Sequence, residues 1–273
     1  YNEWLPSLNM NYDFNNGHLV RMAASKTVSR PRMDDMRANQ QVSFFFNLAN
    51  VTSTDPQQSA WSGSAGNPRL RPLEATQFDV AWDWYFAEDG LFSAAYFYKD
   101  LKNWHRAGSF VADFSEFYIP GYHQVDDENG NPVTPATFDG LVSYREDGLT
   151  GSVNGWELQT IFPFRIFWDK LDGLGVIATA TFLDGGLDDG TDVPGLSDEN
   201  YSFIVFYERG GFDASIAWTK RSKYSTEVRG ESLSLVQTFD QGATLVDAQI
   251  SYDFGANGRA DWLGGLSIAL KGQ

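Results

Sequence analysis

The sequence predicts an all-β chain, an antiparallel transmembrane β-barrel, because polarity alternates with a period of two along long segments separated by unequal connections. In residues 76–86, for example, Phe78, Val80, Trp82 and Trp84 share one face of the expected strand. Such alternating runs are about 10 to 14 residues long, whereas strands of globular sheets usually have about 5 or 6. Tilted strands of about this length cross the hydrocarbon layer of a membrane.

Reading the alternation in order gives about ten consecutive strands. They are expected at residues 4–14, 18–29, 74–86, 91–104, 150–162, 173–183, 200–209, 212–223, 244–254 and 262–272. The segment 109–118 is apolar enough to add a hairpin arm within one of the long connections.

The connections between these strands alternate between short and long. Short turns rich in Gly, Asn and Asp are expected at 15–17, 87–90, 209–211 and 255–258. Long polar segments are expected at 31–71, 106–150, 185–200 and 225–242. This alternation is typical of outer-membrane barrels, which have short periplasmic turns and long external loops. A soluble secreted β-sandwich that binds glycans is the alternative, and it gives no reason for the alternation.

Composition excludes several classes of protein. The 273 residues include 20 Lys+Arg and 36 Asp+Glu, a net charge of −16, which argues against nucleic acid as a partner. The chain has no cysteine, which excludes a disulfide scaffold, a thiol nucleophile and Cys-ligated zinc. No apolar run approaches the roughly 18 residues of a membrane helix, and the first residues do not resemble a signal peptide.

Catalytic chemistry is not expected, and the chain is interpreted as not an enzyme. The three histidines, His18, His105 and His123, are far apart in sequence and lack the spacing of a metal site. No cofactor is expected. The alternative is a Ca²⁺ ion in an external loop, because two acidic, glycine-rich segments at 126–131 and 184–192 resemble calcium loops without matching the EF-hand register.

Several blocks of sequence closely resemble the TonB-dependent receptors of the Gram-negative outer membrane. They include LPSLNMNYDF (5–14), LVRMAASKTVSRP (19–31) and GNPRLRPLEATQFDVAWDWYF (66–86), followed by SVNGWELQ (152–159), YERGGFDASIAWTKRSKY (207–224) and LVDAQISYDF (245–254). The most specific combination is Ser-Arg-Pro after a strand followed by Gly-Asn-Pro-x-Leu-x-Pro. Within the family the chain looks most like the proteobacterial subgroup associated with oligosaccharide uptake.

The resemblance implies that residues 1–273 form part of a 22-stranded barrel that holds an N-terminal plug. The blocks correspond to approximately the twelfth to the twenty-first strand, so the plug domain and the closing strand are expected to be absent from this chain. An open curved sheet with two unpaired edges follows. Because open edges are not tolerated in lipid, we expect that residues 1–273 alone cannot insert as a functional barrel.

The resemblance also implies an integral outer-membrane protein that imports a scarce solute with energy from the TonB complex. Its expected partners are membrane lipid and lipopolysaccharide, its own plug, the TonB complex through that plug, and a small solute. A passive porin is a further alternative.

The polar face of the expected strands would line the barrel lumen. The residues assigned to this face are Asn9, Asn11, Asp13, Arg21, Gln77, Asp79, Asp83, Glu157, Gln159, Asp247 and Gln249. A polar, acidic wall suits contact with a plug and with a hydroxylated solute.

Capture of the solute would fall to aromatic and polar residues in the long external segments. The candidates are Trp61, Trp104, His105, Arg106, Tyr118, Tyr122 and His123. Sugars stack on aromatic rings, whereas an anionic ferric siderophore prefers a basic funnel. Residues 106–150 contain only Arg106 and Arg145 against eight acidic residues. This balance favours a neutral oligosaccharide over a ferric siderophore or cobalamin.

Overall fold

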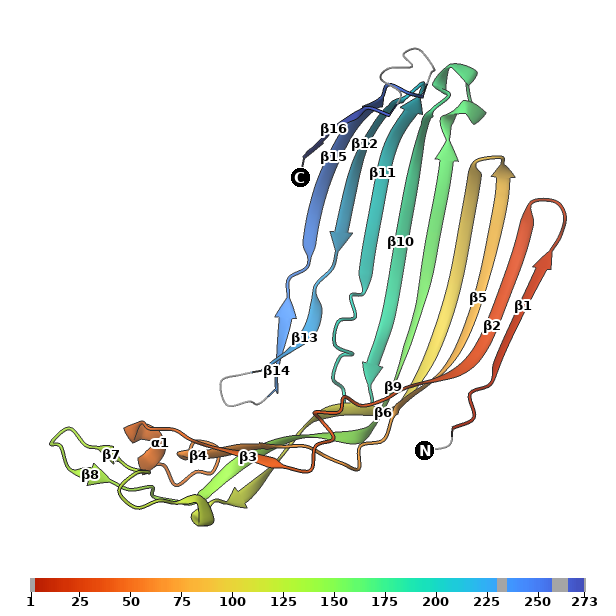
Figure 1. Cartoon of the computed structure of the whole chain (residues 1–273). Coiled ribbons are helices and arrows are strands. Elements are labelled where there is room, and N and C mark those ends of the chain that lie inside the picture. The colour runs from red at the N-terminus through yellow and green to blue at the C-terminus, as the bar shows by residue number, and fades with distance from the viewer. Residues whose placement is uncertain (1–2, 230–234, 257–264, 273) are drawn as a thin grey trace.

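One large antiparallel sheet forms most of the molecule in the computed structural model, which describes residues 3–229, 235–256 and 265–272 (Figure 1). Its main path runs β1-β2-β5-β6-β9-β10-β11-β12-β15-β16, and each strand is hydrogen-bonded to its neighbours in this order. The path therefore follows the order of these strands in the sequence. The bounds are β1 Ser7–Asp13, β2 His18–Ser29, β5 Leu73–Ala87, β6 Gly90–Asp113, β9 Asp139–Pro163, β10 Leu174–Leu187, β11 Glu199–Arg209, β12 Phe212–Arg221, β15 Ala243–Asp253 and β16 Ser267–Gly272.

This path confirms the expected all-β fold and the order of the strands. The curved sheet is open, with β1 at one edge and β16 at the other (Figure 1). β16 begins at Ser267, later than the strand expected at 262–272, because Gly265 and Leu266 are described outside the strand. Residues 262–264 of that strand, and residues 257–258 of the turn expected at 255–258, lie outside the described residues. No helix in the described part of the chain is long and apolar enough to cross a membrane.

Pairing register divides the sheet into two faces of different chemistry. Arg21 lies opposite Asn11 on one side and Ala81 on the other, and the same row continues through Ala95 to Glu157. Followed across the remaining ladders, the register places all eleven residues that the sequence assigned to the lumen on this one face, here called the polar face.

The opposite face is apolar and aromatic, and we call it the apolar face. Phe78, Trp82 and Trp84 of β5 lie there and expose 45%, 37% and 41% of their surface. The same register places Tyr98 of β6 and Phe203 of β11 on this face. Broad exposure of large rings on a continuous sheet face is what contact with lipid requires, because water would penalise it.

The segment 109–118, expected to add a hairpin arm within the second long connection, instead continues β6 of the main sheet as far as Asp113, where it pairs with an equally extended β9. β6 has 24 residues and β9 has 25, and they stay paired out to Asp113 and Asp139. Crossing a membrane takes about 9 to 11 residues of tilted strand. The remainder of both strands therefore projects beyond the wall of the sheet, and we call this projection the arm (Figure 1).

Further elements complete the arm. They are β3 Gln40–Phe44, α1 Leu48–Thr52, β4 Trp61–Ala65, η1 Ser115–Phe117, β7 Val125–Asp126 and β8 Pro132–Val133. β4 pairs with β3 and, in parallel, with β9 through Ser62 opposite Leu141. The segment 31–71, expected to be a polar loop, thus supplies two strands and a helix to the arm.

Apart from the β15–β16 connection, which includes residues outside the described part of the chain, the remaining connections follow the expected alternation of length. At the end of the sheet far from the arm lie the turns between β1 and β2, β5 and β6, and β11 and β12 (Figure 1). The β9–β10 connection at that end contains η2 Phe164–Ile166 and η3 Asp169–Leu171. The 225–242 connection, at the arm end, contains the hairpin of β13 Tyr224–Arg229 and β14 Leu235–Asp240.

Candidate functional site

A polar pocket of about 260 Å³ lies where the arm leaves the wall of the sheet. It is lined by Ser29, Arg30, Pro31, Arg32, Asp35, Leu73, Trp104, His105, Arg145 and Pro194. These residues come from the end of β2 and the segment after it, from the start of β5, from both strands of the arm and from the β10–β11 connection. Ser29 and Leu73 belong to rows of the polar face, so the pocket lies at the arm end of that face.

The pocket forms because both arm strands change direction at this level, which we call the elbow. Pairing between β6 and β9 is regular up to Leu101 and then slips on either side of Trp104. Asn103 has φ 57° and Gly148 has φ 107°, so each strand contains a left-handed residue at the slip. Extra residues in a ladder bend the strand and can re-aim a side chain.

Trp104 is the side chain that the slip re-aims. Regular alternation from Leu101 would place Trp104 on the apolar face. Instead the ring packs against a buried cluster of Leu101, Val153, Leu187 and Val193 at the arm end of the polar face. The indole therefore closes one wall of the pocket, and Val193 holds the β10–β11 connection against the same cluster.

The electrostatic character of the pocket is basic, although the chain as a whole is acidic. The residues that line the pocket include three arginines, Arg30, Arg32 and Arg145, and one acidic residue, Asp35. The side chain of Arg32 is 75% exposed and forms an ion pair of 3.1 Å with Asp34. Because the three arginines come from two segments distant in sequence, their gathering was not visible in the charge balance of residues 106–150.

Ion pairs surround the pocket and connect the arm to neighbouring segments. Arg106 Nε lies 2.7 Å from Glu146 and its Nη1 lies 3.7 Å from Asp189 in the β10–β11 connection. Hydrogen bonds from the hydroxyl and N–H of Thr191 lower the pKa of Asp189, and Arg106 adds to the effect. Arg106 is thus engaged with carboxylates beside the pocket and does not line it.

The other candidates for solute capture gather further out, in an aromatic cluster of the arm. Trp61 exposes 1% of its surface and stacks on Phe114, with ring centroids 5.9 Å apart. His123 lies 4.9 Å from the rings of both Trp61 and Tyr122, and it is 6.3 Å from Tyr118. Trp61 is therefore part of the core of the arm in this structure, whereas Tyr122 is 60% exposed.

Among the residues whose burial is described, Asp83 is the buried charged residue of the polar face. Asp83 exposes 2% of its surface, and its Oδ2 lies 2.8 Å from Arg21 Nη2. Ser93 donates a hydrogen bond of 2.6 Å to Oδ1 of the same carboxylate. This network ties β2, β5 and β6 together on the polar face, near the end of the sheet that is far from the arm.

Both acidic loops contain internal hydrogen bonds. Asp127 Oδ1 accepts N–H bonds of 2.8 Å from both Asn129 and Asn131, which close the β7–β8 hairpin and lower the pKa of Asp127. Among the described residues, no group of three or more His, Asp or Glu side chains is placed to hold a metal ion. A Ca²⁺ ion in an external loop stays a prediction.

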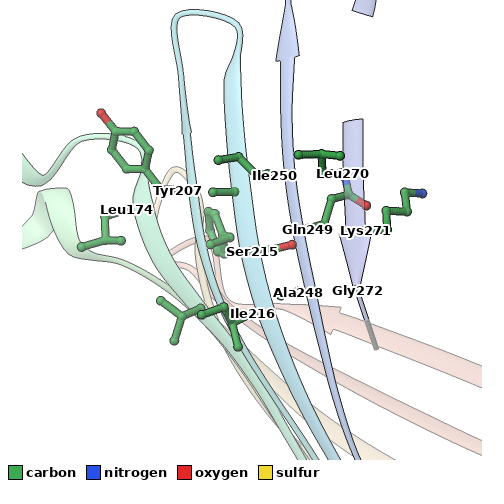
Figure 2. Close-up of a pocket in the computed structure, with 13 residues that line it drawn as sticks. Leu174, Tyr207, Ser215, Ile216, Ala248, Gln249, Ile250, Leu270, Lys271 and Gly272 are labelled. Atoms are coloured by element: carbon green, nitrogen blue, oxygen red, sulfur yellow. The ribbon is translucent and has the colours of Figure 1, made fainter. Parts of the chain in front are cut away.

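A larger hollow of about 580 Å³ lies on β10, β11, β12, β15 and β16 (Figure 2). Its side chains on the apolar face include Leu174, Tyr207, Ile216, Ile250 and Leu270. This apolar lining suits lipid more than a polar solute, so the pocket at the elbow is the better candidate for solute binding.

Comparison with known families identifies the chain. Residues 1–271 match the model of the TonB dependent receptor-like β-barrel. The chain belongs to the TonB-dependent receptor family. Membership makes it a segment of an integral outer-membrane barrel and excludes the soluble sandwich. No curated protein sequence matches it.

Solved structures of TonB-dependent receptors share this fold. The siderophore receptor PirA from Acinetobacter baumannii is 14% identical with a TM-score of 0.61, over 92% of this chain and 35% of the receptor. A mutant ferric enterobactin receptor, PfeA from Pseudomonas aeruginosa, is 12% identical with a TM-score of 0.61, over 92% and 33%. FpvA of P. aeruginosa bound to a heterologous pyoverdine is 15% identical with a TM-score of 0.51, over 92% and 27%. The chain thus spans about a third of the length of these receptors.

The structure separates the seven predicted solute-binding residues of this TonB-dependent receptor segment. Trp104 and His105 line the pocket at the elbow, and Arg106 lies beside it. The other four belong to the aromatic cluster of the arm: Trp61, Tyr118, Tyr122 and His123. The charged residues that line the pocket were not predicted as binding residues from the sequence: Arg30, Arg32, Asp35 and Arg145. The sequence pattern that could have pointed to Arg30 is the Ser-Arg-Pro block at 29–31, which also supports the family resemblance.

Proposed function

We propose that this chain is part of an outer-membrane active transporter that imports a scarce solute, energised by the TonB complex acting through a plug domain. Under this proposal no residue of the chain is catalytic. The polar face lines the passage beside the plug, and the apolar face contacts outer-membrane lipid and lipopolysaccharide. The family match supports the mode of transport, which is general to TonB-dependent receptors.

For the solute we propose an anionic ferric chelate of the siderophore class. The observation that carries this choice is the pocket at the elbow, where three arginines, a histidine and a tryptophan converge. Guanidinium groups bind carboxylate and catecholate oxygens with charge-assisted hydrogen bonds, and an indole ring stacks on aryl groups. A volume of about 260 Å³ suits one acidic or aryl group of a chelate more than a whole chelate. The names of the structurally similar receptors agree with this class.

An oligosaccharide is the second candidate. It is favoured by exposed rings on the arm, where Phe46, Phe117 and Tyr122 expose 53%, 50% and 60% of their surface. Such rings could stack on the apolar faces of sugars. They lie on the projecting part of the molecule, however, whereas the pocket lies at the mouth of the polar face.

Binding and uptake of labelled solutes by cells that carry the receptor test the proposal. A ferric tris-catecholate, which is anionic, is compared with a ferric tris-hydroxamate, which is uncharged, and with neutral oligosaccharides. We expect uptake of the anionic chelate and a loss of about tenfold or more in its affinity in the Arg30→Gln, Arg145→Gln double variant. Arg165→Gln, at the opposite end of the sheet, is the matched control. Uptake of an oligosaccharide without uptake of either chelate would overturn the choice of solute.

A further inference from the structure

Residues 66–72 connect the arm to the wall of the sheet and cross the elbow, and we call this segment the strap. The strap is the Gly-Asn-Pro-Arg-Leu-Arg-Pro block of the sequence, which ends where β5 begins. It contacts both strands of the arm. Asn103 of β6 donates to the carbonyl of Pro72 at 3.3 Å, and Asn67 Nδ2 donates to the carbonyl of Arg145 in β9 at 3.1 Å.

An ion pair fastens the strap to the elbow. The backbone N–H and the Nε of Arg71 both donate to Oδ2 of Asp147, at 2.6 and 2.9 Å. The side chain of Asp147 is only 16% exposed, so this charge is partly shielded from water. Asp147 precedes Gly148, the left-handed residue of β9, so the pair acts at the bend itself.

Internal contacts hold the strap in one shape. Asn67 Oδ1 accepts the N–H of Arg69 at 3.0 Å, and Leu70 is completely buried. A Cβ on Gly66 would lie 2.2 Å from the carbonyl oxygen of Arg37, so only glycine fits at the start of the strap. Because these contacts fix the backbone of the strap, the strap can hold the residues it contacts in fixed positions.

Three residues that line the pocket are held by the strap. The N–H of Asn67 donates to the carbonyl of Asp35 at 2.7 Å, and the Asn67 side chain contacts Arg145 as described. His105 Nε2 lies 2.7 Å from the carbonyl oxygen of Arg71. The strap therefore reaches the 29–35 wall, the β6 wall and the β9 wall of the pocket from one side.

We propose that the strap sets the angle between arm and wall and thereby the geometry of the solute pocket, with Asn67 and Arg71 as positioning residues for recognition. The inference rests on the proposed function, since it assigns a role in binding the proposed solute. Neither residue lines the pocket, so their effect on affinity acts through the residues they hold.

Distance measurements between two spin labels test the strap directly. In the intact receptor, labels are placed at Glu116→Cys on the arm and Glu88→Cys in the β5–β6 turn, two exposed sites in a chain that has no cysteine. Two substitutions weaken the strap without removing bulk. Asn67→Asp keeps the acceptor for Arg69 and removes the donor to Arg145, and Asp147→Asn removes the charge that faces Arg71. Asp89→Asn is the matched control, because Asp89 pairs with Arg165 at 2.7 Å at the other end of the sheet.

We expect both strap variants to broaden the distance distribution and to weaken binding of the ferric tris-catecholate by about tenfold, with Asp89→Asn changing neither. An unchanged distribution in both variants would overturn the role of the strap at the elbow. A broadened distribution with unchanged affinity would overturn its role in recognition. If the unmodified receptor fails to bind the chelate, the proposed solute is wrong, and the distance distributions alone decide whether the strap sets the angle.

Discussion

Trp61 lies at the centre of the aromatic cluster of the arm, and its burial leads to a prediction about stability. Replacing it by alanine leaves a cavity between Phe44 and Phe114, for which core aromatic truncations indicate a loss of about 3 to 5 kcal/mol. We expect faster proteolysis within residues 115–138, with an unchanged barrel. Tyr122→Ala, which removes an exposed ring, is the control. Equal cleavage rates in both variants would show that Trp61 does not hold the arm together.

Arg21 and Asp83 form an ion pair on the polar face, and removing the arginine should lower the free energy of unfolding of the wall. Arg21→Ala leaves the buried carboxylate of Asp83 with Ser93 as its remaining side-chain donor. Because Arg21 is half exposed, we expect a cost of about 2 kcal/mol, below that of breaking a fully buried pair. The denaturant midpoint of the folded receptor measures it. Adding Asp83→Asn to Arg21→Ala should recover part of the loss, and no recovery would contradict this explanation.

At the scale of single residues, only part of the pocket could be predicted from the sequence. Trp104 and His105 could be proposed because aromatic and polar residues adjoin in a long connection. Arg30 and Arg145 are 115 residues apart, and only the elbow brings them to one pocket. Segment composition therefore favoured a neutral solute, while the folded arrangement favours an anionic one.

For the strands and connections, the sequence predicted the wall well and the arm poorly. Period-two alternation holds wherever one face is polar and the other apolar, so the ten wall strands could be placed in order. In the arm the alternation is interrupted at Asn103 and Gly148, where each strand holds a left-handed residue. The pairing of β4 with β9 joins segments about 80 residues apart, which no local pattern indicates.

The elbow should respond to acid. Partial burial raises the pKa of Asp147, but the hydrogen bonds from the side chain and backbone of Arg71 outweigh it and hold the pKa below its ordinary value. A lowered pKa in the folded state means that the pair stabilises the elbow above the ordinary carboxyl pKa, and that this stabilisation is lost as pH falls through the lowered value. We expect the label distance between Glu116→Cys and Glu88→Cys to broaden in that range. His105 and the Arg106–Glu146 pair also face this region, so the Asp147→Asn variant supplies the baseline. An identical acid response in that variant would contradict the assignment.

Considered as a whole molecule, the described sheet has an unpaired edge at β1 and another at β16. Lipid offers no partners for the N–H and C=O groups of such edges. We therefore expect residues 1–273 produced alone to aggregate or remain outside the bilayer. Heat-modifiable migration on gels and resistance to protease in liposomes are the measurements. A compact, detergent-soluble species that shifts on heating would show that the sheet closes by itself or by association.

The continuity of β6 and β9 through the elbow also determines which parts of the chain an antibody could reach on a living cell. Since long connections of such barrels face outward, the 115–138 epitope should be labelled on intact bacteria. The η2–η3 connection at 164–173 should be labelled only after the outer membrane is permeabilised. Because β6 and β9 run without a break from the wall into the arm, a molecule that binds the arm from outside and exerts force on it pulls on two strands of the barrel itself.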